Sequence, residues 1–172
     1  MVYLPQGIFI DIVRRVGSQG FRELEPFIAS GRDGRNAAGN ITAMYVEGLR
    51  RAVKNGPSDE NLDLMKQEED CIPYAGFAYG IFAICGGHYE EGVSAVTLLT
   101  QRVGWLEEMV DIGERVMAQI ADIEPPLSGN YDATYSFPRG DVPNCVHFAC
   151  TMEDVCFDCI TYWYARRVRQ LC

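Results

Sequence analysis

The sequence predicts an all-α fold, built from helical hairpins behind a short N-terminal helical segment. Apolar residues recur at intervals of three and four along most of the chain, which is the spacing that buries one face of a helix. Gly and Pro residues interrupt these patterns repeatedly, as expected where short turns join antiparallel helices. With 172 residues, 48% of them hydrophobic, the chain is long enough to bury a core.

Residues 1–35 predict a separate N-terminal segment. The fixed φ of Pro5 suits the first turn of an amphipathic helix, which we expect to end at Gly17. The apolar positions of this helix and of the stretch after it include Ile8, Ile12, Val16, Phe21 and Leu24. A polar, Gly-rich stretch follows, so we place a soft boundary near Arg35.

Residues 36–172 predict a larger helical body, which begins with a helix and a tight turn. The apolar face of this helix is expected to carry Ile41, Tyr45, Leu49 and Val53. Gly56 can take the left-handed position at the helix end, and Pro57 cannot continue the helix. Ser58 can cap a following helix, so the pattern predicts helix, turn, helix.

The segment Tyr74–Gly104 predicts a helical hairpin. Gly86 and Gly87 are expected to end the first arm, and the acidic Glu90 and Glu91 favour the start of the second. The first arm has small residues at Gly76, Ala78, Gly80 and Ala83. Since each glycine costs a helix about 1 kcal/mol relative to alanine, this density indicates a second helix in close approach.

Three further segments complete the predicted body. Trp105–Ile123 predicts an amphipathic helix, and Pro125–Asn144 predicts a long connector whose aromatic residues drape over the helices. The stripe of the amphipathic helix is expected to contain Leu106, Met109, Val110, Gly113, Val116, Met117 and Ile120. A terminal helix is predicted within Cys156–Cys172, after a capping pair formed by Thr151 and Asp154.

The overall charge restricts the classes of partner. A net charge of -9 and a pI near 4.7 oppose binding to nucleic acid or to anionic lipid. No apolar stretch of about twenty residues and no export signal is visible, so we expect no membrane association and a cytoplasmic or nuclear location. In that setting the seven cysteines are interpreted as thiols or metal ligands rather than disulfides.

Most of the chemistry-bearing residues lie in the segment Pro143–Cys159. Cys156 and Cys159 form a CxxC half-site, and two of Cys145, His147 and Cys150 could complete a tetrahedral zinc site. The candidate metal ligands are therefore Cys145, Cys150, Cys156 and Cys159. Buried thiols on one helical face would leave the same pattern, and both interpretations stay open. The remaining cysteines, Cys71, Cys85 and Cys172, stand apart in the sequence.

No set of residues predicts catalysis. The adjacent carboxylates Glu90 and Glu91 would point to different helix faces, as would Glu107 and Glu108. Neither histidine has an obvious nucleophile beside it, and no glycine-rich loop suits a phosphate. We therefore expect a non-enzymatic protein without a resident cofactor, with zinc as the alternative.

Three segments together resemble a plant F-box family whose members join an N-terminal F-box to a C-terminal tetratricopeptide-like region. They are Leu4–Phe21, Ala37–Ser58 and Tyr74–Gly92, so the resemblance covers most of the chain. Its most specific part is the repeat-like spacing of Gly39, Asn40, Ala43, Tyr45 and Gly48 with Ala78, Tyr79, Gly80 and Gly92. The resemblance implies helical hairpins of the tetratricopeptide-like type in residues 36–172 and an F-box-like segment in residues 1–35.

The resemblance also implies a partner. F-box helices dock on the Skp-type adaptor of a cullin–RING ubiquitin ligase, while the rest of the protein selects an as yet unidentified target. The matching positions here are Leu4, Pro5, Ile8, Ile12, Val16, Phe21 and Leu24. The chain reaches the repeat-like Ala37 soon after Ile28, so this F-box is shortened. Packing of the N-terminal helix on the protein's own core is the alternative role of its apolar face.

Overall fold

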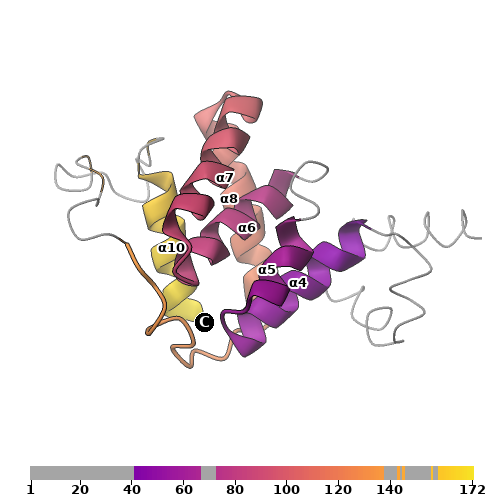
Figure 1. The fold of residues 1–172 in the computed structure, drawn as a ribbon. Coiled ribbons are helices and arrows are strands. Elements are labelled where there is room, and N and C mark those ends of the chain that lie inside the picture. The colour runs from indigo at the N-terminus through magenta and orange to yellow at the C-terminus, as the bar shows by residue number, and fades with distance from the viewer. Residues whose placement is uncertain (1–40, 67–72, 138–142, 144, 146–155, 157–158) are drawn as a thin grey trace, which may run out of the picture.

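The computed structural model describes residues 41–66, 73–137, 143, 145, 156 and 159–172. All regular structure among these residues is helical, which confirms the predicted all-α class (Figure 1). The helices are α4 (Ile41–Asn55), α5 (Asp59–Lys66), α6 (Pro73–Cys85), α7 (Tyr89–Val103), α8 (Leu106–Asp122) and α10 (Ile160–Leu171). None of the described helices is both long and apolar enough to cross a membrane.

The first described hairpin, α4–α5, follows the sequence pattern closely. Tyr45, Leu49 and Val53 are buried on one face of α4, as predicted. Gly56 has a φ of 86°, and the next helix begins at Asp59 after Pro57. The predicted left-handed turn at Gly56 is therefore confirmed.

Helix α6 is the centre of the body and lies between the other helices (Figure 1). Every residue from Ala75 to Cys85 is buried, and α6 contacts α4, α5, α7, α8 and α10. A helix that is apolar on all sides is stable only when other elements surround it. Its composition therefore fixes it as the core helix.

The predicted hairpin of α6 and α7 is also confirmed. Gly86 and Gly87 form the turn, in which Gly87 has a φ of 95°, and Glu90 and Glu91 occupy the first turn of α7. Helix α7 ends at Val103, and the left-handed Gly104 caps it, with its N–H donating to the Thr100 carbonyl oxygen. Helix α8 then buries most of the predicted stripe together with Ile112, while Leu106 and Val110 of that stripe are half-buried.

The connector after α8 is ordered against α10 over residues 125–137, as expected. Leu127 N donates to the Leu171 carbonyl oxygen at 3.1 Å, and Asn130 N donates to that of Cys172 at 2.9 Å. The terminal helix begins at Ile160, with Cys156 in the turn that precedes it. The interpretation that places Cys156 and Cys159 on one helical face is therefore wrong, since α10 starts after both. The predicted N-terminal helix and the Thr151–Asp154 capping pair lie outside the described residues.

Candidate functional site

Each of the two successive hairpins has a glycine at its closest helix contact. A Cβ atom on Gly48 of α4 would meet the Asn61 carbonyl oxygen and Met65 Cγ, each at 3.0 Å. A Cβ atom on Gly80 of α6 would meet the Gly92 carbonyl oxygen at 2.8 Å. In both hairpins, therefore, the first helix lies against a backbone carbonyl of the second at a position where only glycine fits.

The equivalence extends along both hairpins. The Cβ on Gly80 would also meet Val96 Cγ2 at 2.6 Å, and Val96 follows Gly92 by four residues. In the first hairpin, Met65 likewise follows Asn61 by four residues. Each turn also contains a glycine with positive φ, Gly56 in the first hairpin and Gly87 in the second. The α4–α5 and α6–α7 hairpins are thus alike in the glycine that faces a backbone carbonyl and in the use of a positive-φ glycine in the turn.

Three predicted metal ligands come together beside the start of α10. The Cys156 Sγ atom lies 3.4 Å from Cys145 Sγ and 3.4 Å from Cys159 Sγ. All three sulfurs lie within 4.8 Å of one another. Cys159 is buried, whereas Cys145 and Cys156 are half-buried. The fourth predicted ligand, Cys150, lies outside the described residues, as does His147.

The CxxC pair of this cluster is arranged by a tight turn. Cys159 N and Ile160 N both donate to the Cys156 carbonyl oxygen, at 3.2 and 3.0 Å, which brings the two cysteines to the same side. Cys156 N donates to Cys159 Sγ at 3.2 Å. Burial raises the pKa of the Cys159 thiol to about 11. The cluster therefore combines a buried sulfur, a backbone donor aimed at that sulfur and two more accessible thiols.

The sulfur geometry suits a tetrahedral thiophilic ion. Zinc binds cysteine sulfur at about 2.3 Å, so its tetrahedral sulfur ligands lie about 3.8 Å apart. The observed contacts of 3.4 Å require only a small outward movement to reach this spacing. Soft thiolate ligands favour zinc over magnesium or calcium. The residues present therefore fit a zinc ion with three cysteine ligands.

A second pair of thiols lies apart from this cluster. Cys85, at the end of α6, and Cys172, after α10, are both buried. Cys85 Sγ donates to the Ala165 carbonyl oxygen at 3.4 Å, and burial and then the neighbouring Cys172 raise the pKa of its thiol. Cys85 and Cys172 stand apart in the sequence, but the fold brings α10 back to the end of α6 and places the two thiols near each other.

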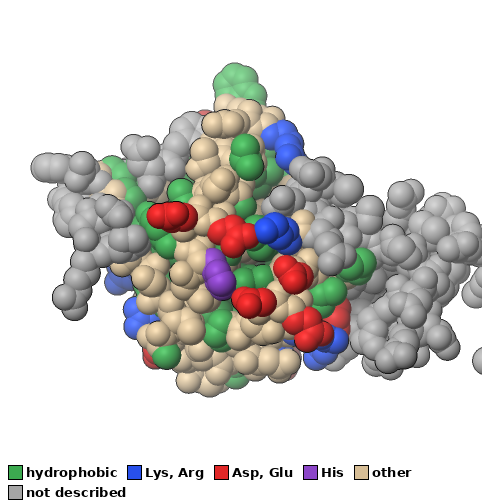
Figure 2. Space-filling view, viewed as in Figure 1, with side chains coloured by type: hydrophobic (Ala, Val, Ile, Leu, Met, Phe, Trp, Pro, Cys, Tyr) green, Lys and Arg blue, Asp and Glu red, His purple; other side chains and the backbone are tan. Residues whose placement is uncertain are grey.

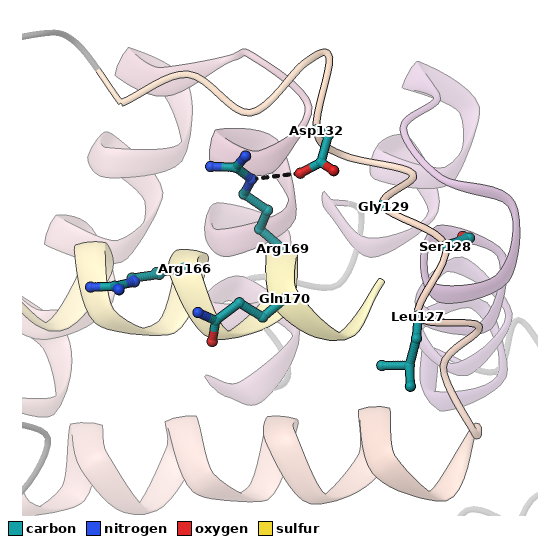
Figure 3. Close-up of a pocket in the computed structure, with 7 residues that line it drawn as sticks. All are labelled: Leu127, Ser128, Gly129, Asp132, Arg166, Arg169 and Gln170. Carbon is teal, nitrogen blue, oxygen red and sulfur yellow. Dashed lines mark hydrogen bonds and ion pairs between the residues drawn. The ribbon is translucent and has the colours of Figure 1, made fainter.

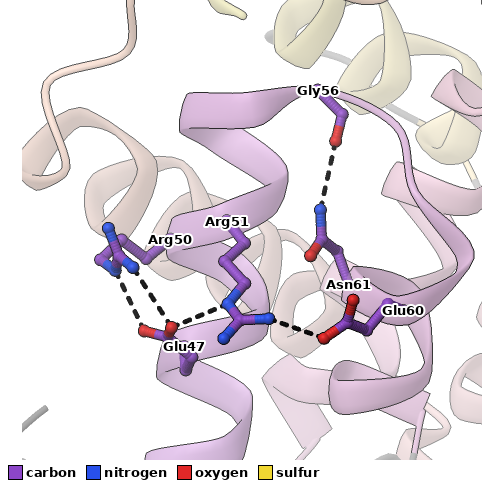
Figure 4. A network of polar contacts seen from close by, with 6 residues as sticks. All are labelled: Glu47, Arg50, Arg51, Gly56, Glu60 and Asn61. Carbon is purple, nitrogen blue, oxygen red and sulfur yellow. Dashed lines mark hydrogen bonds and ion pairs between the residues drawn. The ribbon is translucent and has the colours of Figure 1, made fainter. Parts of the chain in front are cut away.

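The Glu47 carboxylate on α4 is buried at 3% exposure and ion-paired (Figure 4). It accepts hydrogen bonds from Arg51 Nε at 2.8 Å and Arg50 Nε at 3.0 Å. Arg51 also binds Glu60 on α5 at 2.9 Å. Burial acts to raise the pKa of Glu47, but the two arginines outweigh it and hold that pKa below its usual value. The sequence pattern Glu-x-x-Arg-Arg is the signal that could have revealed this network.

Glu91, from one of the predicted carboxylate pairs, and His88 each take part in a surface ion pair. Figure 2 shows acidic side chains gathered around the histidine on one face of the body. His88 Nε2 lies 3.3 Å from Asp59 Oδ1, and Lys66 Nζ lies 2.6 Å from Glu91 Oε1. Both pairs are exposed, and exposed pairs contribute at most about 1 kcal/mol. This face offers a charged surface without a buried acid or base.

A pocket of about 570 Å³ lies where the connector meets α10 (Figure 3). It is lined by Leu127, Ser128, Gly129, Asp132, Arg166, Arg169 and Gln170. Arg169 Nε donates to Asp132 Oδ1 at 2.8 Å, and its guanidinium lies 4.9 Å from the centre of the Tyr135 ring. These contacts join the connector to α10.

The predicted partner-binding residues lie outside the described part of the chain. They are Leu4, Pro5, Ile8, Ile12, Val16, Phe21 and Leu24. Comparisons with known proteins found no family model, no curated protein and no solved structure that matches the chain.

Proposed function

We propose that this chain is a non-enzymatic protein-interaction adaptor that resembles the substrate-recognition subunit of a Skp–cullin–F-box ubiquitin ligase. The single observation that supports this role best is the repetition of one hairpin geometry. Gly48 and Gly80 make equivalent contacts in α4–α5 and α6–α7, and both turns use a left-handed glycine. Such repetition is typical of helical-repeat scaffolds, of which tetratricopeptide-like repeats are one type.

Helical-repeat scaffolds bind proteins through the surfaces that their stacked hairpins expose. In this chain, α6 is buried on all sides, whereas α5, α7 and α8 each carry an exposed face. The exposed charges of the α5–α7 face, including Asp59 and Glu91, are predominantly acidic. A target with a neutral or basic surface therefore suits this body better than nucleic acid does.

The N-terminal segment is proposed as the docking element for a Skp-type adaptor. The Leu4–Pro5 pair and the apolar spacing of Ile8, Ile12 and Val16 in the sequence predict a helix face of the kind that inserts into a hydrophobic groove. An adaptor of this type acts in the cytoplasm or the nucleus. Residues 1–35 would then contact the ligase, and residues 36–172 would contact the target.

Calorimetry with a purified plant Skp-type adaptor tests the proposal. The test variant changes both Ile8 and Ile12 to Asp, which places charge on the proposed docking face. The control is Leu98→Asp on α7, where an apolar side chain with 58% exposure lies on the body instead. We expect saturable binding by the wild-type chain and by the control, and loss of binding in the double variant. No binding by the folded wild-type chain, or equal binding by all three proteins, would overturn the docking role.

A further inference from the structure

We propose that Cys145, Cys156 and Cys159 bind a zinc ion that fastens the connector to the start of α10. The sulfurs come from two segments, since Cys145 belongs to the stretch that follows the connector and the other two belong to the turn before α10. They nevertheless meet with Sγ–Sγ contacts of 3.4 Å around Cys156. This inference goes beyond the proposed adaptor role and does not depend on it.

Several features of the cluster distinguish a metal site from thiols that merely fill the core. Free cysteine thiols are usually fully buried in the core, as Cys85 and Cys172 are. Cys145 and Cys156 are instead half-buried, and both sulfur contacts join them to other cysteines. The N–H of Cys156 also donates to Cys159 Sγ, so a supporting hydrogen bond orients one of the three sulfurs. The three converging sulfurs supply three of the four ligands of a tetrahedral zinc ion, and the fourth position is left for a further donor.

The position of the cluster indicates what the ion does. At its far end, α10 is already joined to the connector, through the hydrogen bonds from Leu127 N and Asn130 N to the last carbonyl groups. The cluster lies at the opposite end of α10, directly before Ile160. An ion held there would fix the beginning of the helix as the hydrogen bonds fix its end. Because a structural ion binds the folded chain only, its binding energy adds to stability.

Elemental analysis of the full-length chain, purified under reducing conditions and without a metal-binding tag, is the first test. The test variant is Cys156→Ser, which removes the sulfur that contacts both others. The control is Cys172→Ser, which alters a buried thiol beside Cys85. We expect one equivalent of zinc in the wild-type and control proteins. In Cys156→Ser we expect the affinity for zinc to fall at least about tenfold, because the loss of a contact that merely supports a ligand already has an effect of that size. A folded wild-type chain without zinc, or unchanged affinity in the variant, would overturn the proposal.

Cobalt substitution and chelation provide readouts that hold even if Cys156→Ser fails to fold. Cobalt bound to the wild-type chain should show the intense visible bands of a tetrahedral ion and a sulfur-to-metal charge-transfer band, and a spectrum without thiolate bands would overturn the site.

A chelator should lower the unfolding temperature of the wild-type chain, and no change would contradict a structural ion. Disulfides among these cysteines in the metal-free, air-exposed protein, with no zinc in the reduced protein, would assign the cluster to redox chemistry instead. Adaptor calorimetry is independent of all these readouts, so the two proposals can fail separately.

Discussion

Gly80 of α6 and Gly92 of α7 lie so close together that a Cβ atom on Gly80 would come within 2.8 Å of the Gly92 carbonyl oxygen. The approach is reciprocal, since a Cβ atom on Gly92 would clash with the Gly80 carbonyl oxygen and would also lie 3.0 Å from Ile84 N. Backbone atoms on both sides of the contact leave little room for adjustment. The central α6–α7 hairpin therefore requires glycine at both positions, because a side chain at either one would clash with the other helix.

Replacing Gly80 by alanine should destabilise the protein. Alanine favours a helix over glycine by up to about 1 kcal/mol, but overpacking a tight contact costs about 1–3 kcal/mol, and here the contacting atoms include backbone. We expect a net loss of about 1–2 kcal/mol in the free energy of unfolding, measured by urea denaturation. Ser94→Ala, at an exposed site of α7, is the control and should change stability by less than about 0.5 kcal/mol. A Gly80→Ala protein as stable as the wild type would contradict the close approach.

The buried Glu47 carboxylate should make stability depend on pH in the acidic range. Because its pKa is lower in the folded state, the unfolded chain binds the proton more tightly. The stabilisation is therefore complete above the unfolded pKa of about 4.3 and is lost as the pH falls through the lower folded pKa. Glu47→Gln should cost about 1–3 kcal/mol at pH 7, the range for hydrogen bonds to charged groups, and its deficit should shrink toward pH 3.

Urea denaturation of both proteins from pH 7 to pH 3 measures this convergence. Glu60→Gln is the matched control, because the Glu60 side chain also binds Arg51 but is 77% exposed. An exposed pair of this kind should contribute at most about 1 kcal/mol. If Glu47→Gln lost no more stability than Glu60→Gln, or if its deficit stayed constant with pH, the buried network would not stabilise the fold as argued.

Local periodicity explains which parts of the fold were predictable from the sequence. The buried face of α4 and the stripe of α8 follow from the spacing of apolar residues, and the turns at Gly56 and Gly87 follow from residue type. The contact between Gly113 of α8 and the ring of Tyr164 could not be predicted from the sequence, because a stripe of apolar residues does not identify the helix against which it packs. A Cβ atom on Gly113 would lie 2.8 Å from both Cε atoms of that ring.

The cysteines show the same division between local and long-range information. Their density within Pro143–Cys159 indicated metal ligands, and the structure brings Cys145, Cys156 and Cys159 together. Spacing alone left open which cysteines meet, because it did not show that the CxxC pair lies in a turn before α10. The neighbouring Cys85 and Cys172 are far apart in sequence, and only the return of α10 to α6 places them together.

Tyr131 should prove to be the residue that holds the connector on the body. Its side chain is 1% exposed, its ring contacts Phe82 with a centroid distance of 5.8 Å, and its hydroxyl donates to the Ala52 carbonyl oxygen at 2.7 Å. Tyr131→Phe removes only the hydrogen bond and should cost about 0.5–1.5 kcal/mol, whereas Tyr131→Ala also empties the ring site and should cost about 3–5 kcal/mol. Urea denaturation measures both losses, and limited proteolysis should show faster cleavage within the connector of Tyr131→Ala. Ser136→Ala, at an exposed connector position, should leave both measurements unchanged. Wild-type stability and cleavage in Tyr131→Ala would mean that other contacts hold the connector.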